Sequence, residues 1–164
     1  EKLSAKDVKA NAIRLMKEDA YEAALKNWMY LKKNTDDLDP MIPFQVGKCL
    51  EHLDSTAEAA KAYRQAITIM TENKALIQDK LFLEALISLG EVEKANQNFT
   101  SAIETYKCFL DYETRATIQV PLETMDFVKS KIEECEQEIE ARIKGNGTGN
   151  GKNVPYPSNS TKSK

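Results

Sequence analysis

A pattern of small and aromatic residues occurs three times along the 164-residue sequence and limits the possible folds more than any other feature. In each occurrence an aromatic residue lies four positions after an alanine, and a small residue lies twelve positions before that alanine. The columns, in chain order, are Ala12, Gly47 and Gly90; Tyr21, Thr56 and Phe99; Ala24, Ala59 and Ala102; Trp28, Tyr63 and Tyr106; and Leu31, Ala66 and Phe109. The occurrences are 35 and 43 residues apart. Repetition at a period of roughly 20 to 50 residues is typical of solenoids and related repeat folds.

The columns have the spacing expected of two helices that pack closely. Ala24 and Trp28 are four residues apart and therefore share one face of a helix, and the other two units have the same arrangement. A small residue such as Gly47, in the middle of the preceding helix, lets the partner helix approach. The sequence therefore predicts three antiparallel helix pairs.

The second helix of each pair is carried by YEAALKNWMYL, TAEAAKAYRQAI and FTSAIETYKCFL. Two antiparallel helices in about 34 residues, with small–aromatic–small spacing, resemble the tetratricopeptide repeat (TPR). The resemblance covers residues 5–112 approximately. It implies an all-α fold: a TPR-like right-handed superhelix of three helix-turn-helix repeats plus a C-terminal capping helix.

Hydrophobic periodicity and turn residues predict seven helices. Six of them form the repeats, at 4–18, 20–34, 41–53, 55–71, 74–96 and 99–113. We expect the fifth to be long because the inserted residues ENKALIQDK are good helix formers. The β-branched stretch TRATIQVP then interrupts the pattern. A last helix over 122–144 carries apolar residues at spacings of three and four, namely Val128, Ile132, Cys135, Ile139 and Ile143.

These elements divide the chain into three parts. Residues 1–120 form a repeat domain, with repeats at about 5–38, 40–73 and 80–115. Residues 121–144 form an amphipathic capping helix, because a solenoid needs a polar-faced end. Residues 145–164, GNGTGNGKNVPYPSNSTKSK, have the composition of a disordered polar tail.

The distribution of glycine and proline excludes the main alternatives to a helical fold. Four of the six glycines and two of the five prolines lie after residue 144. The rest of the chain has too few turn residues for a β-sandwich or β-barrel, and it lacks the glycine loops of a βαβ enzyme.

Charge and hydropathy exclude two classes of partner. Residues after 144 carry three of the 23 basic residues and none of the 26 acidic ones, which leaves a net charge of −6 on the body. A body this acidic is unsuited to binding a phosphate backbone, so we expect no nucleic-acid partner. No run approaches the roughly eighteen apolar residues of a membrane-spanning helix.

Few residues can carry chemistry. His52 is the only histidine, and Cys49 precedes it by three residues, but no second pair completes a tetrahedral metal site. Cys49 also lies two residues after Gly47, where a free cysteine packs well in a core. The three cysteines, Cys49, Cys108 and Cys135, do not form a disulfide framework and favour a reducing, cytoplasmic location. We therefore predict no enzyme, no catalytic residue, no metal site and no cofactor.

In TPR proteins the first helices of the repeats line a concave groove that binds an extended peptide or a partner helix. The resemblance places fifteen residues at groove positions: Lys9, Ile13, Met16 and Lys17 in the first repeat; Met41, Phe44, Gln45, Lys48, Glu51 and His52 in the second; and Glu84, Ile87, Ser88, Glu91 and Lys94 in the third. They mix apolar and polar groups, as a peptide groove requires. The alternative is that Met16, Met41 and Phe44 seal one repeat onto the next, since groove and packing positions adjoin in solenoids.

One TPR subfamily can be compared at these positions. Members that hold the C-terminal carboxylate of heat-shock chaperones use a clamp of Lys and Asn, with Lys and Arg from the third repeat. Lys9 matches the first position, but Ile13 stands where Asn is required. Glu84 and Ser88 stand where the basic pair belongs. Because Glu84 would repel a carboxylate, the sequence disfavours this ligand.

Two narrower resemblances indicate client classes. Residues 20–89, with DPMIPFQVGKCLEHL at 39–53, look like the type III secretion translocator chaperones, whose groove keeps an unfolded translocator segment soluble. That resemblance makes Met41, Phe44 and Lys48 groove contacts, although the further repeat, the long last helix and the tail depart from it. The segment ISLGEVEKANQNFTSAIETY is similar to the third repeat of histone-binding TPR chaperones. The acidic body suits a basic client, but the large acidic insertion of that family is absent.

The sequence thus predicts a non-catalytic protein–protein interaction module, an adaptor or chaperone whose concave groove binds a peptide or helix of a client. The alternatives are a structural subunit of a larger assembly, bound through the C-terminal helix, and a histone-binding TPR chaperone. The expected partner is a protein or peptide, and a homo-oligomer or a complex subunit stays open.

Overall fold

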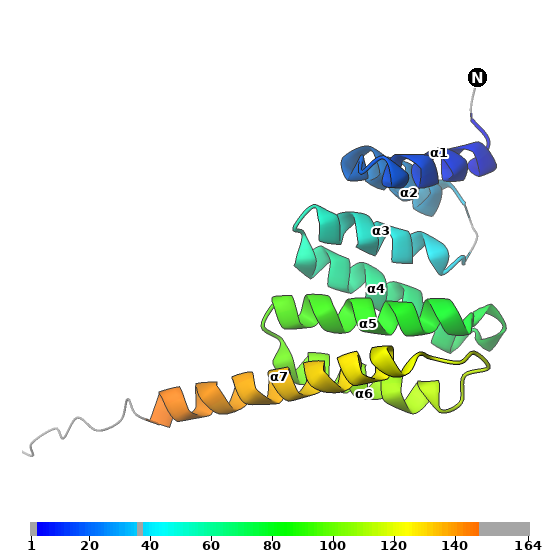
Figure 1. Ribbon diagram of the computed structural model, residues 1–164. Coiled ribbons are helices and arrows are strands. Elements are labelled where there is room, and N and C mark those ends of the chain that lie inside the picture. Colours follow the sequence, from blue (N-terminus) through cyan, green and yellow to red (C-terminus); the bar gives the residue numbers. More distant parts are fainter. Residues whose placement is uncertain (1–2, 36–37, 148–164) are drawn as a thin grey trace, which may run out of the picture.

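The computed structural model describes residues 3–35 and 38–147. They form seven α-helices and one short 3₁₀ helix: α1 (Ala5–Lys17), α2 (Tyr21–Asn34), α3 (Met41–His52), α4 (Thr56–Glu72), η1 (Lys74–Leu76), α5 (Asp79–Ala95), α6 (Phe99–Glu113) and α7 (Leu122–Gly147). Figure 1 shows the first six α-helices stacked as three antiparallel pairs, with α7 crossing α6. The described part of the chain contains no strand, so the predicted all-α fold is confirmed. None of its helices is long and apolar enough to cross a membrane.

The repeat helices begin and end within one residue of the predicted bounds, with one exception. The predicted helix over 74–96 is wrong at its start, because η1 and two residues with extended ψ angles, Ile77 and Gln78, precede α5. The Asn73 side chain accepts a hydrogen bond from the backbone N–H of Ala75 at 3.2 Å. Such a local bond offers the backbone a separate turn as an alternative to a continuous helix.

The last helix also differs from the prediction, at its end. α7 continues to Gly147, beyond the predicted end at 144. The predicted tail over 145–164 is therefore wrong for residues 145–147, because glycine weakens a helix without forbidding it. Residues 148–164 of the predicted tail lie outside the described residues.

The longer spacing between the second and third units is explained by two longer helices. α4 runs thirteen residues past Ala59, whereas α2 runs ten past Ala24. α5 begins eleven residues before Gly90, whereas α3 begins six before Gly47. The linkers 35–40 and 73–78 are equally long. The insertion therefore adds helix to α4 and α5 on the side of the stack where the chain also passes from α6 to α7 (Figure 1).

Each of the two glycines in the column of Ala12 lies against a buried tyrosine ring. A Cβ atom added to Gly47 would lie 2.6 Å from Cε1 of Tyr63, and one added to Gly90 would lie 2.4 Å from Cε1 of Tyr106. Both tyrosines are completely buried. The first helix of these units therefore approaches the second so closely that the contact leaves no room for a side chain.

The two helices of every unit are joined by the same turn. Asp19, Asp54 and Gln97 occupy equivalent positions and have φ angles of 57°, 57° and 62°. In each turn the N–H of the following residue bonds to a carbonyl five residues back, as Ser55 does to Leu50 at 2.8 Å. This bond belongs to the motif that closes helices after a left-handed residue. It sets the same antiparallel geometry three times.

Successive units pack through one further set of columns. Ile42, Val46 and Cys49 on α3 share a core with Trp28 of the first unit. The equivalent residues on α5 are Ala85, Leu89 and Val92, and exactly the same columns recur 43 residues later on α7 as Val128, Ile132 and Cys135. All nine side chains are buried. α7 therefore packs on α6 as the first helix of a fourth unit would, and it closes the core as the predicted capping helix.

Both ends of the stack are polar. The α1 residues that correspond to Ile42, Val46 and Cys49 are Asp7, Asn11 and Arg14, and Arg14 bonds to Asn11 and Glu18 at 2.8 and 2.7 Å. On α5 one buried side faces α6. The residues at the same positions of α7 are Lys129, Glu133 and Glu136, and all three are exposed. The acidic residues of α7 thus cover an outer end, as the solubility of a solenoid requires.

Candidate functional site: the concave groove

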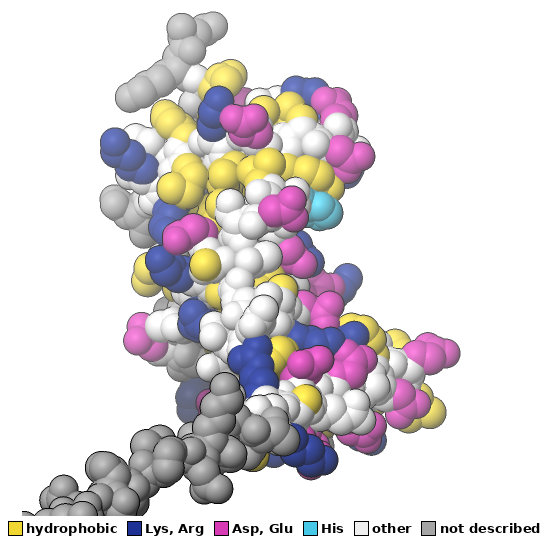
Figure 2. Space-filling model, turned by 90° about the vertical axis from the view of Figure 1, so that its left-hand side faces the viewer, with side chains coloured by type: hydrophobic (Ala, Val, Ile, Leu, Met, Phe, Trp, Pro, Cys, Tyr) yellow, Lys and Arg dark blue, Asp and Glu magenta, His cyan; other side chains and the backbone are white. Residues whose placement is uncertain are grey.

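The first helices of the units form one side of the molecule. In Figure 1, α1, α3, α5 and α7 lie in the nearer layer and cover α4 and α6. Figure 2 turns the molecule by 90° and shows this side as a hollow between the N-terminal unit and a lower lobe formed by α7. The groove is therefore lined by four helices, one more than the three first helices predicted from the sequence.

Thirteen of the fifteen predicted groove residues keep accessible surface. The exceptions are Phe44, which is 4% exposed and packs on Tyr63 with 5.7 Å between ring centroids, and Ser88, which is 7% exposed. Both carry too little surface to hold a partner. The remaining residues are half-buried or exposed: Lys9, Ile13, Met16, Lys17, Met41, Gln45, Lys48, Glu51, His52, Glu84, Ile87, Glu91 and Lys94.

Two predicted residues of α1 have partners within the protein. The ammonium group of Lys9 lies 3.2 Å from Oδ2 of Asp39, in the linker before α3. The sulfur of Met16 accepts a hydrogen bond from the buried indole N–H of Trp28 at 3.3 Å. Ile13 between them is 40% exposed. The only position that matched the carboxylate clamp, Lys9, is thus already paired with an acid.

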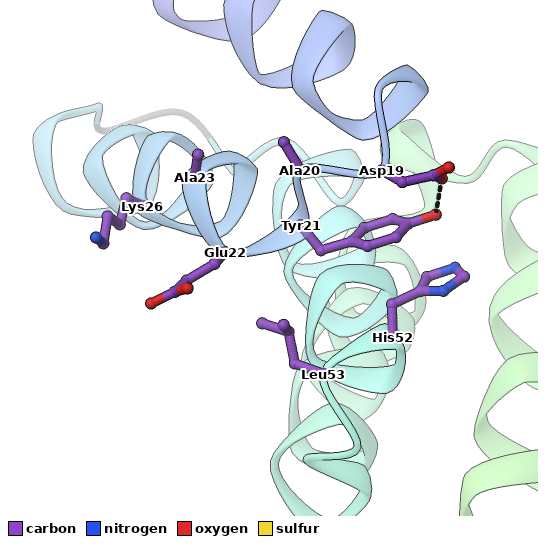
Figure 3. Close-up of a pocket in the computed structure, with 8 residues that line it drawn as sticks. All are labelled: Asp19, Ala20, Tyr21, Glu22, Ala23, Lys26, His52 and Leu53. Atoms are coloured by element: carbon purple, nitrogen blue, oxygen red, sulfur yellow. Dashed lines mark hydrogen bonds between the residues drawn. The ribbon is translucent and has the colours of Figure 1, made fainter.

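His52 lies apart from the centre of the groove. Its ring stacks on that of Tyr21, with 3.9 Å between centroids, in a cleft of about 620 Å³ between the turns of the first two units (Figure 3). The Tyr21 hydroxyl donates to Asp19 at 2.9 Å, and this bond raises the pKa of Tyr21. Burial raises the pKa of the Cys49 thiol to about 11, which keeps it protonated. Among the described residues no group of three or more His, Cys, Asp and Glu side chains could hold a metal ion.

Buried tyrosines hold two carboxylates at the floor of the groove. The Tyr63 ring passes under Gly47, and its hydroxyl donates to Oε2 of Glu51 at 2.5 Å. The Tyr106 ring passes under Gly90 and donates to Oε1 of Glu91 at 2.9 Å. Burial, and then the carboxylate, raise the pKa of both tyrosines, so both hydroxyls stay protonated and act as donors. The close approach of the tyrosine rings to Gly47 and Gly90 therefore also determines where the floor acids lie.

An ion network joins α5 to α7 across the groove. Glu134 of α7 accepts from Lys94 of α5 and from Lys131 of its own helix, the latter at 3.2 Å. The hydrogen bond from Lys94 and, to a smaller extent, that from Lys131 lower the pKa of Glu134. The same bond to Glu134 raises the pKa of Lys94. Lys131 also lies 5.2 Å from the ring centroid of Phe127, which is 39% exposed. Because these groups are partly exposed, the pairs orient α7 more than they stabilise it.

A pocket of about 400 Å³ lies between α5, the end of α6 and the start of α7. Glu84 and Ile87 are the predicted groove residues that line it. The other lining residues are not among the predicted groove positions: Lys80, Leu83, Phe109, Ile118, Gln119, Val120, Pro121 and Thr124. The signal that could have found them is the recurrence of the packing columns at Val128, Ile132 and Cys135, because it makes α7 a groove helix.

The segment between α6 and α7 is held in place by Asp79. Its Oδ2 accepts from the backbone N–H and the hydroxyl of Thr117, both at 2.6 Å, and its Oδ1 accepts from the Tyr112 hydroxyl at 2.6 Å. These hydrogen bonds lower the pKa of Asp79, and the bond from the Thr117 hydroxyl contributes most. Burial and Asp79 together raise the pKa of Tyr112 to about 12. The sequence stretch that interrupts the repeat pattern thus forms a fixed wall of the pocket.

Comparison with known proteins identifies the fold. No family model and no curated protein matches the chain. Among solved structures, the first TPR domain of Spaghetti (RPAP3), bound to the HSP90 peptide SRMEEVD, is 16% identical, with a TM-score of 0.63 over 83% of this chain and 93% of that one. The TPR2B domain of yeast Sti1, in a pHsp70 complex, is 18% identical, with a TM-score of 0.65 over 79% and 96%.

A third structure extends the likeness over more of the chain. The Sgt2 TPR domain from Aspergillus fumigatus is 14% identical, with a TM-score of 0.62 over 94% of this chain and 90% of that domain. At such identities the likeness establishes the fold alone. Together with the three repeated helix pairs and their recurring columns, it shows that the chain has the TPR fold: an all-α right-handed superhelix of three helix-turn-helix repeats closed by a C-terminal helix.

Proposed function

We propose that this protein is a non-catalytic interaction module whose concave groove binds a peptide segment of a client. The observation that carries the proposal is the composition of the groove. Accessible apolar and charged side chains from α1, α3, α5 and α7 line one hollow, and buried tyrosines hold its floor carboxylates in fixed positions. Such a mixture of anchors and oriented polar groups suits recognition of an extended peptide.

The structural neighbours support the same use of the fold. The Spaghetti domain was solved with an HSP90 peptide and the Sti1 domain in a pHsp70 complex. For this chain we propose peptide binding without the carboxylate clamp. Lys9 is paired with Asp39, Ile13 offers no hydrogen bond, and Glu84 places a negative charge where a clamp needs a positive one.

The arrangement of chemically reactive side chains supports a non-catalytic role. His52 stacks on Tyr21 at the turns of the repeats, and Cys49 is completely buried. No nucleophile is hydrogen-bonded to the imidazole among the hydrogen bonds of the described residues. The three cysteines are free, which suits the reducing cytoplasm that we propose as the location. The translocator-chaperone and histone-chaperone resemblances stay predictions.

Peptide binding can be tested with an unbiased library. We expect phage-displayed random dodecapeptides to yield ligands for the full chain, and we expect Lys48→Glu to weaken their binding at least about tenfold. Lys48 is half-buried on α3 and lies 5.7 Å from the Phe44 ring centroid. The matched control is Lys61→Glu on α4, whose side chain is 70% exposed on the second-helix layer. Isothermal titration calorimetry gives both dissociation constants.

Two outcomes of this experiment would overturn the proposed function. The first is that no peptide is selected at micromolar affinity. The second is that folded Lys48→Glu protein binds every selected peptide as tightly as the Lys61→Glu control does.

A further inference from the structure

The pocket between α5 and α7 is a property of this chain's irregular third unit. The five residues that lengthen α5 at its start include Lys80 and Leu83, and both line the pocket. The opposite wall is the segment from Ile118 to Pro121, which follows the last repeat helix. In the second unit, which lacks the added helix, the position equivalent to Leu83 is Pro40, the residue just before α3.

The interior of this pocket is apolar and its walls are fixed. Leu83 and Phe109 are 4% and 1% exposed and form its base, whereas Ile118 is 40% exposed at its rim. The bonds from Thr117 and Tyr112 to Asp79 hold the rim segment, and the Tyr112 ring packs on Phe82 with 4.5 Å between centroids. A volume of about 400 Å³ lies within the range of roughly 300–1,000 Å³ typical of ligand pockets. The pocket therefore offers a formed seat for one large apolar side chain.

Two acids lie on the groove face of α5, one at the pocket and one beyond it. Glu84 lines it, and its side chain is 50% exposed, with an ion pair only at 4.0 Å to the highly exposed Lys80. Glu91 lies two turns further along the same face of α5, with its carboxylate held by Tyr106. The next bases along the groove, Lys94 and Lys131, are both paired with Glu134. Glu84 and Glu91 thus remain available to a cationic partner.

We propose that this pocket seats one aliphatic or aromatic side chain of an extended peptide whose neighbouring residues are Lys or Arg that pair with Glu84 and Glu91. This inference rests on the proposed function and specifies its ligand. The apolar anchor gains free energy by leaving water, and the two acids select the charge of the flanking residues. An acidic peptide meets like charges at the same place and is rejected.

The test uses two libraries of N-acetylated, C-amidated decapeptides against the full chain. In the basic library a central Leu, Ile, Phe or Tyr is flanked by Lys and Arg, and in the acidic library the flanks are Asp and Glu. We expect the basic library to bind at least about tenfold more tightly at 0.15 M salt, and this preference to shrink at 0.5 M salt.

Single substitutions then test the apolar anchor and the flanking charges separately. Ile118→Glu should weaken binding of the basic peptides at least about tenfold, whereas Ile143→Glu, at a 67% exposed position of α7 away from the pocket, should change it less than about twofold. Glu84→Lys should abolish the preference for basic peptides, whereas Glu104→Lys on the exposed side of α6 should keep it. The milder variants Ile118→Ala and Glu84→Gln replace them if Ile118→Glu or Glu84→Lys impairs folding, which circular dichroism reports.

The results also distinguish this inference from the proposed function. If Lys48→Glu weakens binding of peptides from the unbiased library while Ile118→Glu and Glu84→Lys do not, groove binding stands and the proposed apolar anchor with basic flanks is wrong. Equal binding of the acidic and basic libraries would likewise overturn the inference. If no concave-side variant changes any affinity, both are wrong.

Discussion

Gly90→Ala should lower the free energy of unfolding by about 2 kcal/mol, although alanine is the better helix former. The added Cβ would lie 2.4 Å from Cε1 and 2.6 Å from Cζ of Tyr106, and this ring is completely buried and hydrogen-bonded to Glu91. Neither the ring nor the helix can yield without opening the contact between α5 and α6. Denaturation by urea, followed by circular dichroism, measures the change.

The same substitution at Gly145 is the matched control. Gly145 is also in a helix, but nothing lies within 4 Å of the position that its Cβ would take. Gly145→Ala should therefore leave stability unchanged or raise it by up to about 1 kcal/mol. The double variant Gly90→Ala/Tyr106→Leu should lose less than the two single losses together, because a smaller side chain relieves the clash. A neutral Gly90→Ala would mean that the close contact does not exist.

Val128→Asp should cost about 3 kcal/mol of unfolding free energy and release α7 from the last repeat. Val128 is completely buried, in the column that also holds Ala85 on α5. A carboxylate at this position has no partner in the core, so undocking of the helix is the remaining way to solvate it. Hydrogen exchange should show the loss of protection confined first to α7.

Ile143→Asp on the same helix provides the comparison. Ile143 is 67% exposed, so its replacement should change stability by less than about 0.5 kcal/mol. Because Thr124 and the 118–121 segment line the pocket, Val128→Asp should also abolish binding of pocket-directed peptides. Equal effects of the two variants would contradict the assignment of α7 as a fourth groove helix.

The repeated part of the fold could be predicted from the sequence because packing dictates its residues. Ala24, Ala59 and Ala102 are all completely buried, and so are Trp28, Tyr63 and Tyr106. A helix pair that must fit into such a contact admits only small residues at one column and large ones at the other. That constraint fixed five of the six repeat helices to within one residue.

The rest of the fold depends on particular side-chain interactions that no short sequence pattern contains. The start of α5 is determined by Asn73 bonding to Ala75 and by Asp79 meeting Tyr112 and Thr117, which are distant in sequence. Glu93 looks like a surface residue, yet it is 2% exposed and accepts bonds from Arg64 and Thr105 at 2.8 and 2.7 Å. Helical propensity and composition cannot anticipate such long-range partners.

For the groove, too, one part could be predicted from the sequence and another part could not. Neighbouring positions on α3 face either the core or the hollow, and a rotation of a fraction of a turn separates buried Phe44 from half-buried Gln45 and Lys48. The composition of α7 indicates a solvated amphipathic helix, yet Phe127, Lys131 and Glu134 lie on the side that meets α5. The groove positions follow from the TPR resemblance, and side-chain packing decides which of those residues are accessible.

The most direct test of the central claim, that the concave side of α1, α3, α5 and α7 binds peptide, is nuclear magnetic resonance mapping of the full chain titrated with a peptide from the unbiased selection. We predict that the largest shift changes fall on amides and methyl groups of the concave side, including Lys48, Ile87 and Lys131. Residues exposed on the second helices, such as Lys61, Glu104 and Cys108, should stay unchanged. Shift changes confined to those second-helix positions, with the concave residues unaffected, would contradict the account.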